Sequence, residues 1–282
     1  MQEDLERQIS DKRLAAFASF LTREEKSSAT KAKYARDVRA FAEFLSSAPV
    51  TKEQVILYKE WLTARYAVRS VNSMLASLNS FFHFMGWEDC SVRRIRTQKQ
   101  LFCPEEEELT KEEYWRLLQA AERKDRRLYL ILQTLGGTGI RISELEEVTA
   151  EAVAEGKAVV YCKNKVRTIF FPERLRKQLL DFLALKNIGH GPVFQTKGGR
   201  PVDRSNVWKS LKILCREAGV SPEKVFPHNL RHLFARTFYE AEKDLAKLAD
   251  ILGHSSMDTT RIYIVSDGKE HQKQIDGLGL VI

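Results

Sequence analysis

The chain has 282 residues and a mass of 32.5 kDa, and this length predicts two domains because single cores usually hold about 100–200 residues. Hydrophobic residues make up 43% and charged residues 30%, as in a folded protein with packed cores, and no apolar run approaches the roughly 18–20 residues that span a bilayer. The first thirteen residues mix acidic and basic side chains and lack the apolar stretch of a signal peptide, so we expect a cytoplasmic protein that makes no membrane contact.

The four cysteines lie far apart and form no CxxC pair. Paired cysteines at short spacing are typical of a zinc ribbon, and regularly spaced cysteines are typical of a disulfide framework. We therefore expect neither metal ligands nor disulfides, but free or buried thiols, at Cys90, Cys103, Cys162 and Cys215.

The positive charge is unevenly spread. The net charge is +8 and the isoelectric point is about 9.2. Residues 1–100 and 151–200 are basic, whereas residues 101–150 are net acidic. Two basic regions that flank an acidic connector favour a polyanion, such as nucleic acid, held between two domains.

The first hundred residues predict helices throughout. Apolar side chains recur every three or four positions over 30–45 and form one buried stripe, opposite a basic face. A second helix is expected to start at Thr51, and a third to run from about 69 to 85 and to end at Gly86. Such short helices with basic outer faces predict a small helical bundle.

A linker is predicted between the two domains. The stretch 91–109 begins basic, passes Pro104 and becomes a run of glutamates, without apolar periodicity. A charge reversal around a proline is typical of a linker. The predicted organisation is a helical domain over 1–96, a linker over 97–108 and a second domain over 109–282.

The second domain is expected to begin with a helix, because Thr110 and Glu113 have the spacing of a capping box. Helices follow to Leu135, where Gly136 and Gly137 are expected to interrupt them. Two runs rich in β-forming residues, 159–162 and 168–171, flank a short polar turn and predict a β-hairpin. Helices are expected to resume after Pro172.

The hexapeptide PHNLRH predicts an anion site. Pro227 favours a helix start, so His228 and Arg231 share a face near free N–H groups, which attract anions. Two alternatives remain open. His228 and His232 have the spacing of zinc ligands, although Asn229 stands where such a site needs a glutamate, or His228 is an ordinary capping residue.

The run TGIRISEL places a second arginine after a glycine. Ile142, Leu145 and Val148 are expected to face inward on a helix, which leaves Arg141 and Glu144 together on another face. A carboxylate then holds a guanidinium next to backbone amides. The alternative is an ordinary surface ion pair, which stabilises little.

The run LGHSSMDTTRIY holds a histidine and a tyrosine. Gly253 is expected to end a helix over 245–252, and Ser255 with Asp258 resembles the cap of the next helix. His254 is thereby held in a tight turn, and Tyr263 follows about two and a half helical turns later. The alternative for Tyr263 is a half-buried packing residue.

Four runs, in this order, resemble the tyrosine recombinase (phage integrase) family: TGIRISEL, CKNKVRTIFFP, HNLRHLFA and LGHSSMDTTRIY. The resemblance covers 109–263, and the N-terminal helices are similar to the core-binding domain of that family. It implies a mainly α protein with a helical, SAM-like core-binding domain. The second domain would be an α+β catalytic domain with a small antiparallel hairpin.

The resemblance also implies a role for each residue. Tyr263 would attack a DNA phosphodiester and leave a 3′-phosphotyrosine and a free 5′-hydroxyl. Arg141 and Arg231 would stabilise the phosphorane-like transition state, and His254 would hydrogen-bond a non-bridging oxygen.

Proton transfer would fall to other side chains. His228 would act as general base or proton relay, and Glu144 would orient His228 and the arginine-bearing helix. Lys163 on the hairpin would protonate the leaving 5′ oxygen. The hairpin is one residue shorter than the Gly-Lys-Gly-Asn-Lys pattern common among relatives, so Lys165 remains the alternative to Lys163.

The activity implied is site-specific DNA recombination, by a homo-tetramer on two double-stranded DNA sites, with no metal or nucleotide cofactor. Two alternatives are type IB topoisomerase-like relaxation of DNA and a DNA-binding regulator without chemistry. The sequence leaves open whether the biological role is resolution of chromosome dimers or movement of a mobile element. Possible DNA phosphate contacts are Lys33, Arg36, Arg69 and Lys209.

Overall fold

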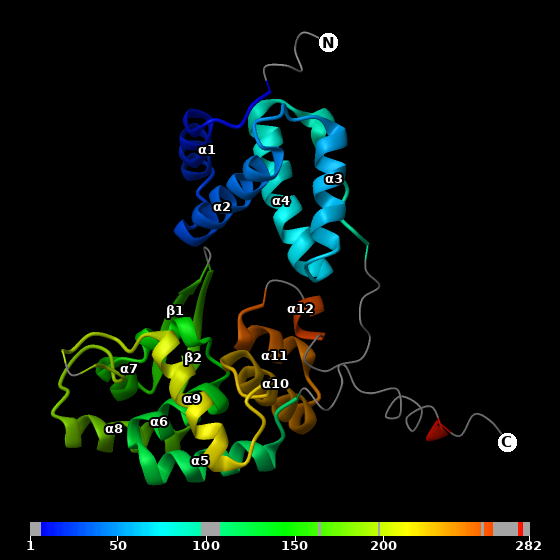
Figure 1. The fold of residues 1–282 in the computed structure, drawn as a ribbon. Coiled ribbons are helices and arrows are strands. Elements are labelled where there is room, and N and C mark those ends of the chain that lie inside the picture. The colour runs from blue at the N-terminus through cyan, green and yellow to red at the C-terminus, as the bar shows by residue number, and fades with distance from the viewer. Residues whose placement is uncertain are drawn as a thin grey trace. The chain divides into compact units, whose positions relative to one another are not determined.

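The computed structural model describes residues 7–96, 108–162, 165–196, 198–254, 257–261 and 276–278. Its internal contacts divide the chain into two compact units, 1–99 and 100–282 (Figure 1). Nearly all of the predicted linker, 97–107, lies outside the described residues, so the predicted domain boundaries stay a prediction. No described helix is long and apolar enough to cross a membrane.

The first unit is helical, as predicted. Its helices are α1 (Asp11–Arg23), α2 (Ser28–Leu45), α3 (Lys52–Thr63) and α4 (Val68–Met85), followed by a short 3₁₀ helix, Glu88–Cys90. The hydroxyl of Thr51 accepts a hydrogen bond from the amide of Gln54 at the start of α3. Gly86 ends α4 with a φ of 70°, a left-handed conformation that glycine adopts without strain. Both predicted helix ends are therefore confirmed.

Aromatic side chains fill the interior of the first unit. Phe17, Phe41, Phe81 and Phe82 are fully buried, and Tyr58 of α3 packs on Phe41 with ring centroids 5.0 Å apart. Each such ring buries on the order of 150–250 Å². The first unit thus has a hydrophobic core of its own.

The second unit is mainly helical with one small sheet, which confirms the predicted fold class. Its helices are α5 (Lys111–Lys124), α6 (Arg126–Thr138), α7 (Ala150–Glu155), α8 (Glu173–Lys186), α9 (Arg204–Ala218), α10 (Pro227–Glu242), α11 (Leu245–Leu252) and α12 (Met257–Arg261). A 3₁₀ helix, Ile142–Glu147, follows α6. The strands β1 (Lys157–Cys162) and β2 (Lys165–Phe170) form the predicted hairpin.

The hairpin has one buried face and one exposed face. Its strands pair antiparallel from Lys157–Phe170 to Cys162–Lys165. Val160 and Ile169 point inward and are buried, whereas Tyr161 is largely exposed. This alternation is the period of two expected of a half-buried strand.

The predicted interruption at Gly136 and Gly137 is wrong, because α6 continues through both to Thr138. A Cβ atom on Gly136 would lie 2.6 Å from the hydroxyl oxygen of Tyr114 on α5. The glycine therefore permits close approach of two helices and does not end one. Gly139, with a φ of 62°, ends α6 instead.

Two hydrophobic clusters position the C-terminal helices of the second unit. The larger cluster joins α5, α6, α8 and α9 to the first half of α10. A smaller one, Ala235, Leu248 and Leu252 with Phe234 and Phe238 against it, joins α10 to α11. These clusters bring the start of α10, the end of α6 and the end of α11 to one place in the second unit.

Candidate active site

Arg231 lies where the start of α10, the end of α6 and the end of α11 meet. Its side chain is only 1% exposed and is the largest fully buried side chain among the described residues. Its Nη1 atom donates to the carbonyl of Gly139 at 2.5 Å, and its Nη2 atom donates to the carbonyl of Leu252 at 2.6 Å. Nη2 also lies 3.0 Å from Nε2 of His254. A buried guanidinium needs such partners, and these join α10 to the ends of α6 and α11.

Arg141 lies two residues after Gly139, at the start of the 3₁₀ helix. Its backbone amide donates to one carboxylate oxygen of Glu144 and its Nη1 atom donates to the other, both at 2.8 Å. The Arg141 side chain is 34% exposed, whereas that of Glu144 is 5% exposed. The pair is therefore not the ordinary surface ion pair considered above. The guanidinium is held in place and still reaches solvent.

Glu144 stays ionised. Burial alone would raise its pKa, but hydrogen bonds from the amide and guanidinium of Arg141, together with the charge of Arg167, outweigh burial and lower the pKa below its usual 4.5. The carboxylate thus remains negative at neutral pH and can orient Arg141.

His254 occupies the turn between α11 and α12, as the sequence predicted. Burial, followed by the positive charges of Arg231, Arg141 and Arg167, lowers the pKa of His254 to about 4, so the ring is neutral at pH 7. An arginine can only donate, so Nε2 accepts from Arg231 and the ring proton resides on Nδ1. Nδ1 lies 2.8 Å from Oγ1 of Thr260, to which it donates.

His232 lies about one helical turn after His228 on α10. His228 is exposed, and its ring meets that of His232 edge-on with centroids 4.6 Å apart. Burial, then the neighbouring charges of His228 and Arg236, lower the pKa of His232 to about 3. Among the described residues, no group of three or more His, Cys, Asp or Glu side chains could hold a metal ion.

Two of the predicted site residues, Lys163 and Tyr263, lie outside the described residues. For Lys165 the backbone alone is described, and it pairs with Cys162 at the end of the hairpin. The choice between Lys163 and Lys165, and the role of Tyr263, therefore remain predictions.

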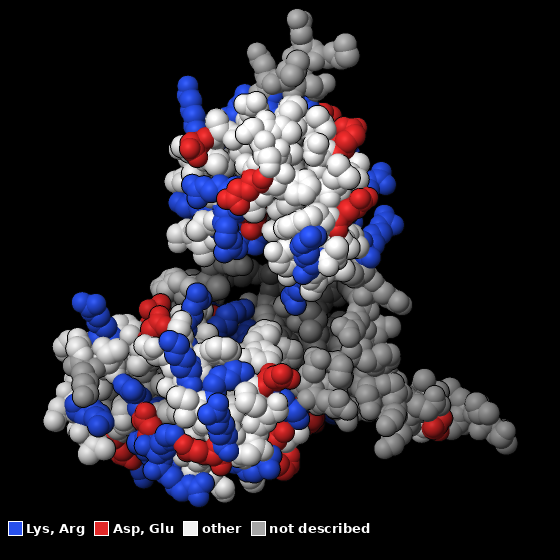
Figure 2. Space-filling model, in the orientation of Figure 1, with Lys and Arg blue, Asp and Glu red and all other residues white. Residues whose placement is uncertain are grey.

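The four possible DNA contacts differ in their surroundings. Lys33 is 32% exposed, and its Nζ atom donates to Asp37 at 2.5 Å and to two further acceptors on α4. Arg36 is 75% exposed, and Arg69 and Lys209 are exposed as well. Of the two on α2, Arg36 is the better placed to meet a phosphate. Figure 2 shows that Lys and Arg are interspersed with Asp and Glu on the visible face of each unit.

Sequence reasoning did not single out Arg167, whose guanidinium contacts Glu144 at 2.5 Å. One signal was available, because Arg167 occupies an inward position of β2, where the neighbouring inward residues are apolar. A charged residue on the apolar face of a strand indicates a buried partner.

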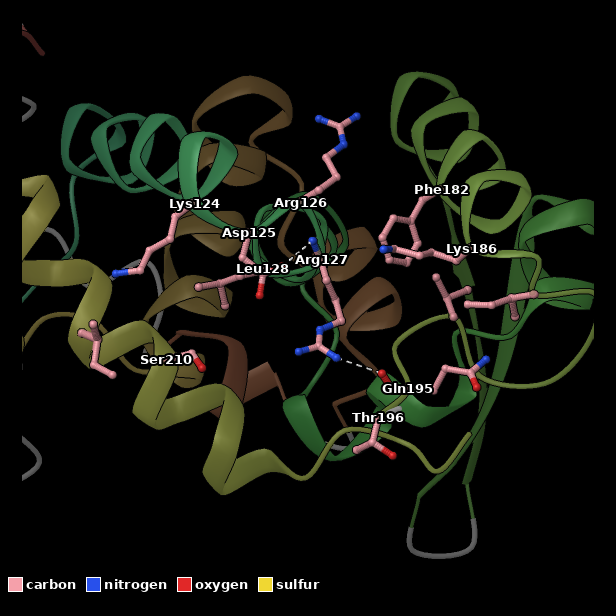
Figure 3. Close-up of a pocket in the computed structure, with 13 residues that line it drawn as sticks. Lys124, Asp125, Arg126, Arg127, Leu128, Phe182, Lys186, Gln195, Thr196 and Ser210 are labelled. Carbon is pink, nitrogen blue, oxygen red and sulfur yellow. Dashed lines mark hydrogen bonds between the residues drawn. The ribbon is translucent and has the colours of Figure 1, made fainter. Parts of the chain in front are cut away.

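A separate pocket lies at the opposite end of α6. It has a volume of about 870 Å³ and is lined by basic and apolar side chains, among them Lys124, Arg126, Arg127 and Lys186. Figure 3 shows Arg127 reaching across it to the carbonyl of Gln195, at 2.9 Å. None of the predicted site residues lines this pocket.

Comparison with known protein families gives two matches. Residues 107–270 match the phage integrase family, and residues 14–89 match the phage integrase N-terminal SAM-like domain. The first match covers more than half of the chain and spans Arg141, His228, Arg231, His254 and Tyr263.

Curated relatives match along most of their length. Tyrosine recombinase XerA of Pyrococcus furiosus is 28% identical over 95% of this chain and 94% of its own. Tyrosine recombinase XerD of Halalkalibacterium halodurans is 29% identical over 82% and 84%. Tyrosine recombinase XerA of Thermococcus kodakarensis is 30% identical over 70% and 71%.

Solved structures have the same fold. The match to a crystal structure of XerA recombinase covers 96% of this chain and 99% of the XerA chain, with 25% identity and a TM-score of 0.54. The match to a lambda integrase tetramer bound to a Holliday junction covers 92% of this chain and 78% of the integrase chain, with 18% identity and a TM-score of 0.74. The chain therefore belongs to the phage integrase family and is a tyrosine recombinase, a DNA strand transferase.

Proposed function

We propose that this chain recombines double-stranded DNA at specific sites through a 3′-phosphotyrosine intermediate on Tyr263. One observation carries the proposal: Arg231, Arg141 and His254 come from separate elements and converge. Arg231 makes hydrogen bonds both to the turn before Arg141 and to His254. Two guanidiniums and an imidazole at one place suit the oxygens of a phosphodiester in its transition state.

The proposed reaction balances without a cofactor. The Tyr263 oxygen attacks phosphorus and forms a P–O bond, while the bond from phosphorus to the 5′ oxygen breaks. The proton of Tyr263 passes to His228, which is exposed at the start of α10. Lys163, or Lys165 in the alternative, gives a proton to the 5′ oxygen, which leaves as a hydroxyl. Attack by a 5′-hydroxyl of another strand reverses these steps and rejoins the DNA.

His254 contributes a hydrogen bond in this proposal. Its Nε2 accepts from Arg231 and its Nδ1 proton goes to Thr260, so the neutral ring needs a second proton before it can donate to a phosphate oxygen. Protonation next to a bound phosphate would supply one, because an adjacent anion favours the charged form of histidine.

The proposed assembly is a homo-tetramer on two DNA sites in the cytoplasm. It is supported by solved relatives described as a lambda integrase tetramer bound to a Holliday junction and as XerH bound to its difH substrate. A type IB topoisomerase-like activity would instead relax a supercoiled plasmid that carries no recombination site, and we expect no relaxation in that assay.

Covalent trapping tests the proposal. A pool of nicked suicide duplexes with a randomised core is incubated with the protein, and covalent complexes are isolated under denaturing conditions and sequenced. We expect wild type to form an adduct and Tyr263→Phe to form none while binding the same DNA. Tyr66→Phe, at an exposed tyrosine of the first unit, is the matched control and should retain the adduct. An undiminished adduct in Tyr263→Phe would contradict the assignment.

A further inference from the structure

A single arginine outside the predicted site joins three elements that carry predicted site residues. Arg167 follows Lys163 by four positions and Lys165 by two, and it pairs with Val160 on the inward face of the hairpin. Its side chain is 8% exposed. An arginine is rarely buried to this degree unless its guanidinium is paired.

The first contact of Arg167 is with Glu144. Its Nη2 atom donates to Oε2 of Glu144 at 2.5 Å, and the same oxygen accepts from the backbone amide of Arg141 at 2.8 Å. The other oxygen of Glu144 accepts from Nη1 of Arg141. The carboxylate that orients Arg141 is therefore itself oriented by Arg167.

The second contact is with the end of α11. Nη1 of Arg167 donates to the carbonyl of Ile251 at 2.6 Å. The last carbonyls of a helix have no partner within the helix and carry a partial negative charge, so a guanidinium is a favourable cap for them. This bond holds the chain three residues before His254.

The side-chain stem of Arg167 also packs on the turn that carries His254. A Cβ atom on Gly253 would collide with Cδ of Arg167. Gly253 has a φ of 66°, so glycine is favoured there for its backbone as well. The close approach leaves Arg167 little freedom to move relative to His254.

We propose that Arg167 is a positioning residue: its guanidinium fixes the hairpin, Glu144 with Arg141, and the α11 turn with His254 in one arrangement. This inference rests on the proposed function, because it concerns the same site. Arg167 acts through Glu144 and the α11 end, and a misplacement of reacting groups by about 1 Å can cost on the order of 10²-fold in rate.

The test measures single-turnover cleavage of a suicide duplex at saturating DNA. Arg167→Met keeps the aliphatic stem and removes the donors, and we expect its rate to fall by about 10- to 100-fold with unchanged affinity for DNA. Arg127→Met, at the far end of α6 and roughly 18 Å from Gly139 along the helix axis, is the matched control and should stay within about twofold of wild type.

A double variant separates positioning from general stability. If Arg167 acts partly through Glu144, the loss of rate caused by Arg167→Met should be smaller in the Glu144→Gln background than in wild type, and the loss that remains reports the contact with Ile251. Near-UV circular dichroism checks folding, and Arg167→Lys, which keeps the buried charge, replaces Arg167→Met if the latter does not fold.

Two outcomes would overturn the inference: cleavage within about twofold of wild type in the folded variant, or multiplicative losses in the double variant. Both require that wild type forms the Tyr263 adduct. Absence of the adduct in wild type would instead count against the proposed function, so the two failures are distinguishable.

Discussion

At the scale of single residues, the two candidate arginines differ in what holds them. Arg231 is buried and donates to carbonyls 92 and 21 positions away, so backbone dipoles help to balance its charge. Arg141 is partly exposed and is held by Glu144. One guanidinium is thus part of the core of the second unit, and the other rests at its surface, where a phosphate can reach it.

The two neutral histidines of this region predict a dependence of stability on pH. The pKa values of His254 and His232 are lowered from 6.5 to about 4 and about 3. Below pH 6.5 the unfolded chain therefore binds protons that the folded chain does not, and stability falls as the pH falls. We expect a loss of about 1–2 kcal/mol in the free energy of unfolding between pH 7 and pH 5, discounted for partial exposure.

Urea unfolding at pH 7 and pH 5 measures this effect. The pH range stops at 5 because the lowered pKa of Glu144 adds a loss of the same sign below about 4.5. In His232→Gln the difference between the two pH values should shrink. An equal pH dependence in wild type and in this variant would show that folding does not lower the pKa of His232.

At the scale of elements, the two adjacent glycines of α6 have different surroundings. A Cβ on Gly136 would collide with the Tyr114 ring, whereas a Cβ on Gly137 meets nothing within 4 Å. Two glycines inside a helix cost about 1 kcal/mol each in propensity. At Gly136 the contact between α5 and α6 outweighs this cost in helix propensity. At Gly137 no such contact compensates for it.

The element-scale prediction follows from this pair. Gly136→Ala should lower the free energy of unfolding by about 1–3 kcal/mol because Tyr114 has to move out of a tightly packed site. Gly137→Ala should raise it by up to about 1 kcal/mol through helix propensity alone. Chemical denaturation of the two variants beside wild type measures both changes, and destabilisation by Gly137→Ala equal to that by Gly136→Ala would refute the packing explanation.

At the scale of the whole molecule, the described residues form separate hydrophobic cores in the two units. The first core is built around the phenylalanines of α1, α2 and α4, and the clusters of the second unit contain none of its residues. A unit with its own core can fold alone when it buries enough apolar surface.

We therefore expect residues 1–96, expressed alone, to fold into the helical unit of α1 to α4. Far-UV circular dichroism should show a helical spectrum, and thermal unfolding should be cooperative. Leu75→Ala, at a fully buried position of α4, should lower the melting temperature of the fragment and of the full chain alike. A fragment without cooperative unfolding would mean that this core depends on the second unit.

Much of the fold was predictable because local sequence spacing encodes it. The caps at Thr51 and Thr110, the helix ends at Gly86 and Gly253 and the presence of the hairpin all depend on residues a few positions apart. The interruption predicted at Gly136 failed for the opposite reason, since the partner that explains it, Tyr114, lies on another helix.

The sequence by itself determined the order of the motifs, the helical character of both units and the residue types that suit phosphoryl transfer. Only the tertiary structure decided that Arg231 is buried, that Lys33 is bonded to Asp37 and that Arg167 shares Glu144 with Arg141. The physical reason is the distance along the sequence between the residues that interact. Periodicity and capping depend on neighbours within a helical turn, whereas Arg167 and Ile251 meet across 84 positions, and only packing of the whole unit brings them together.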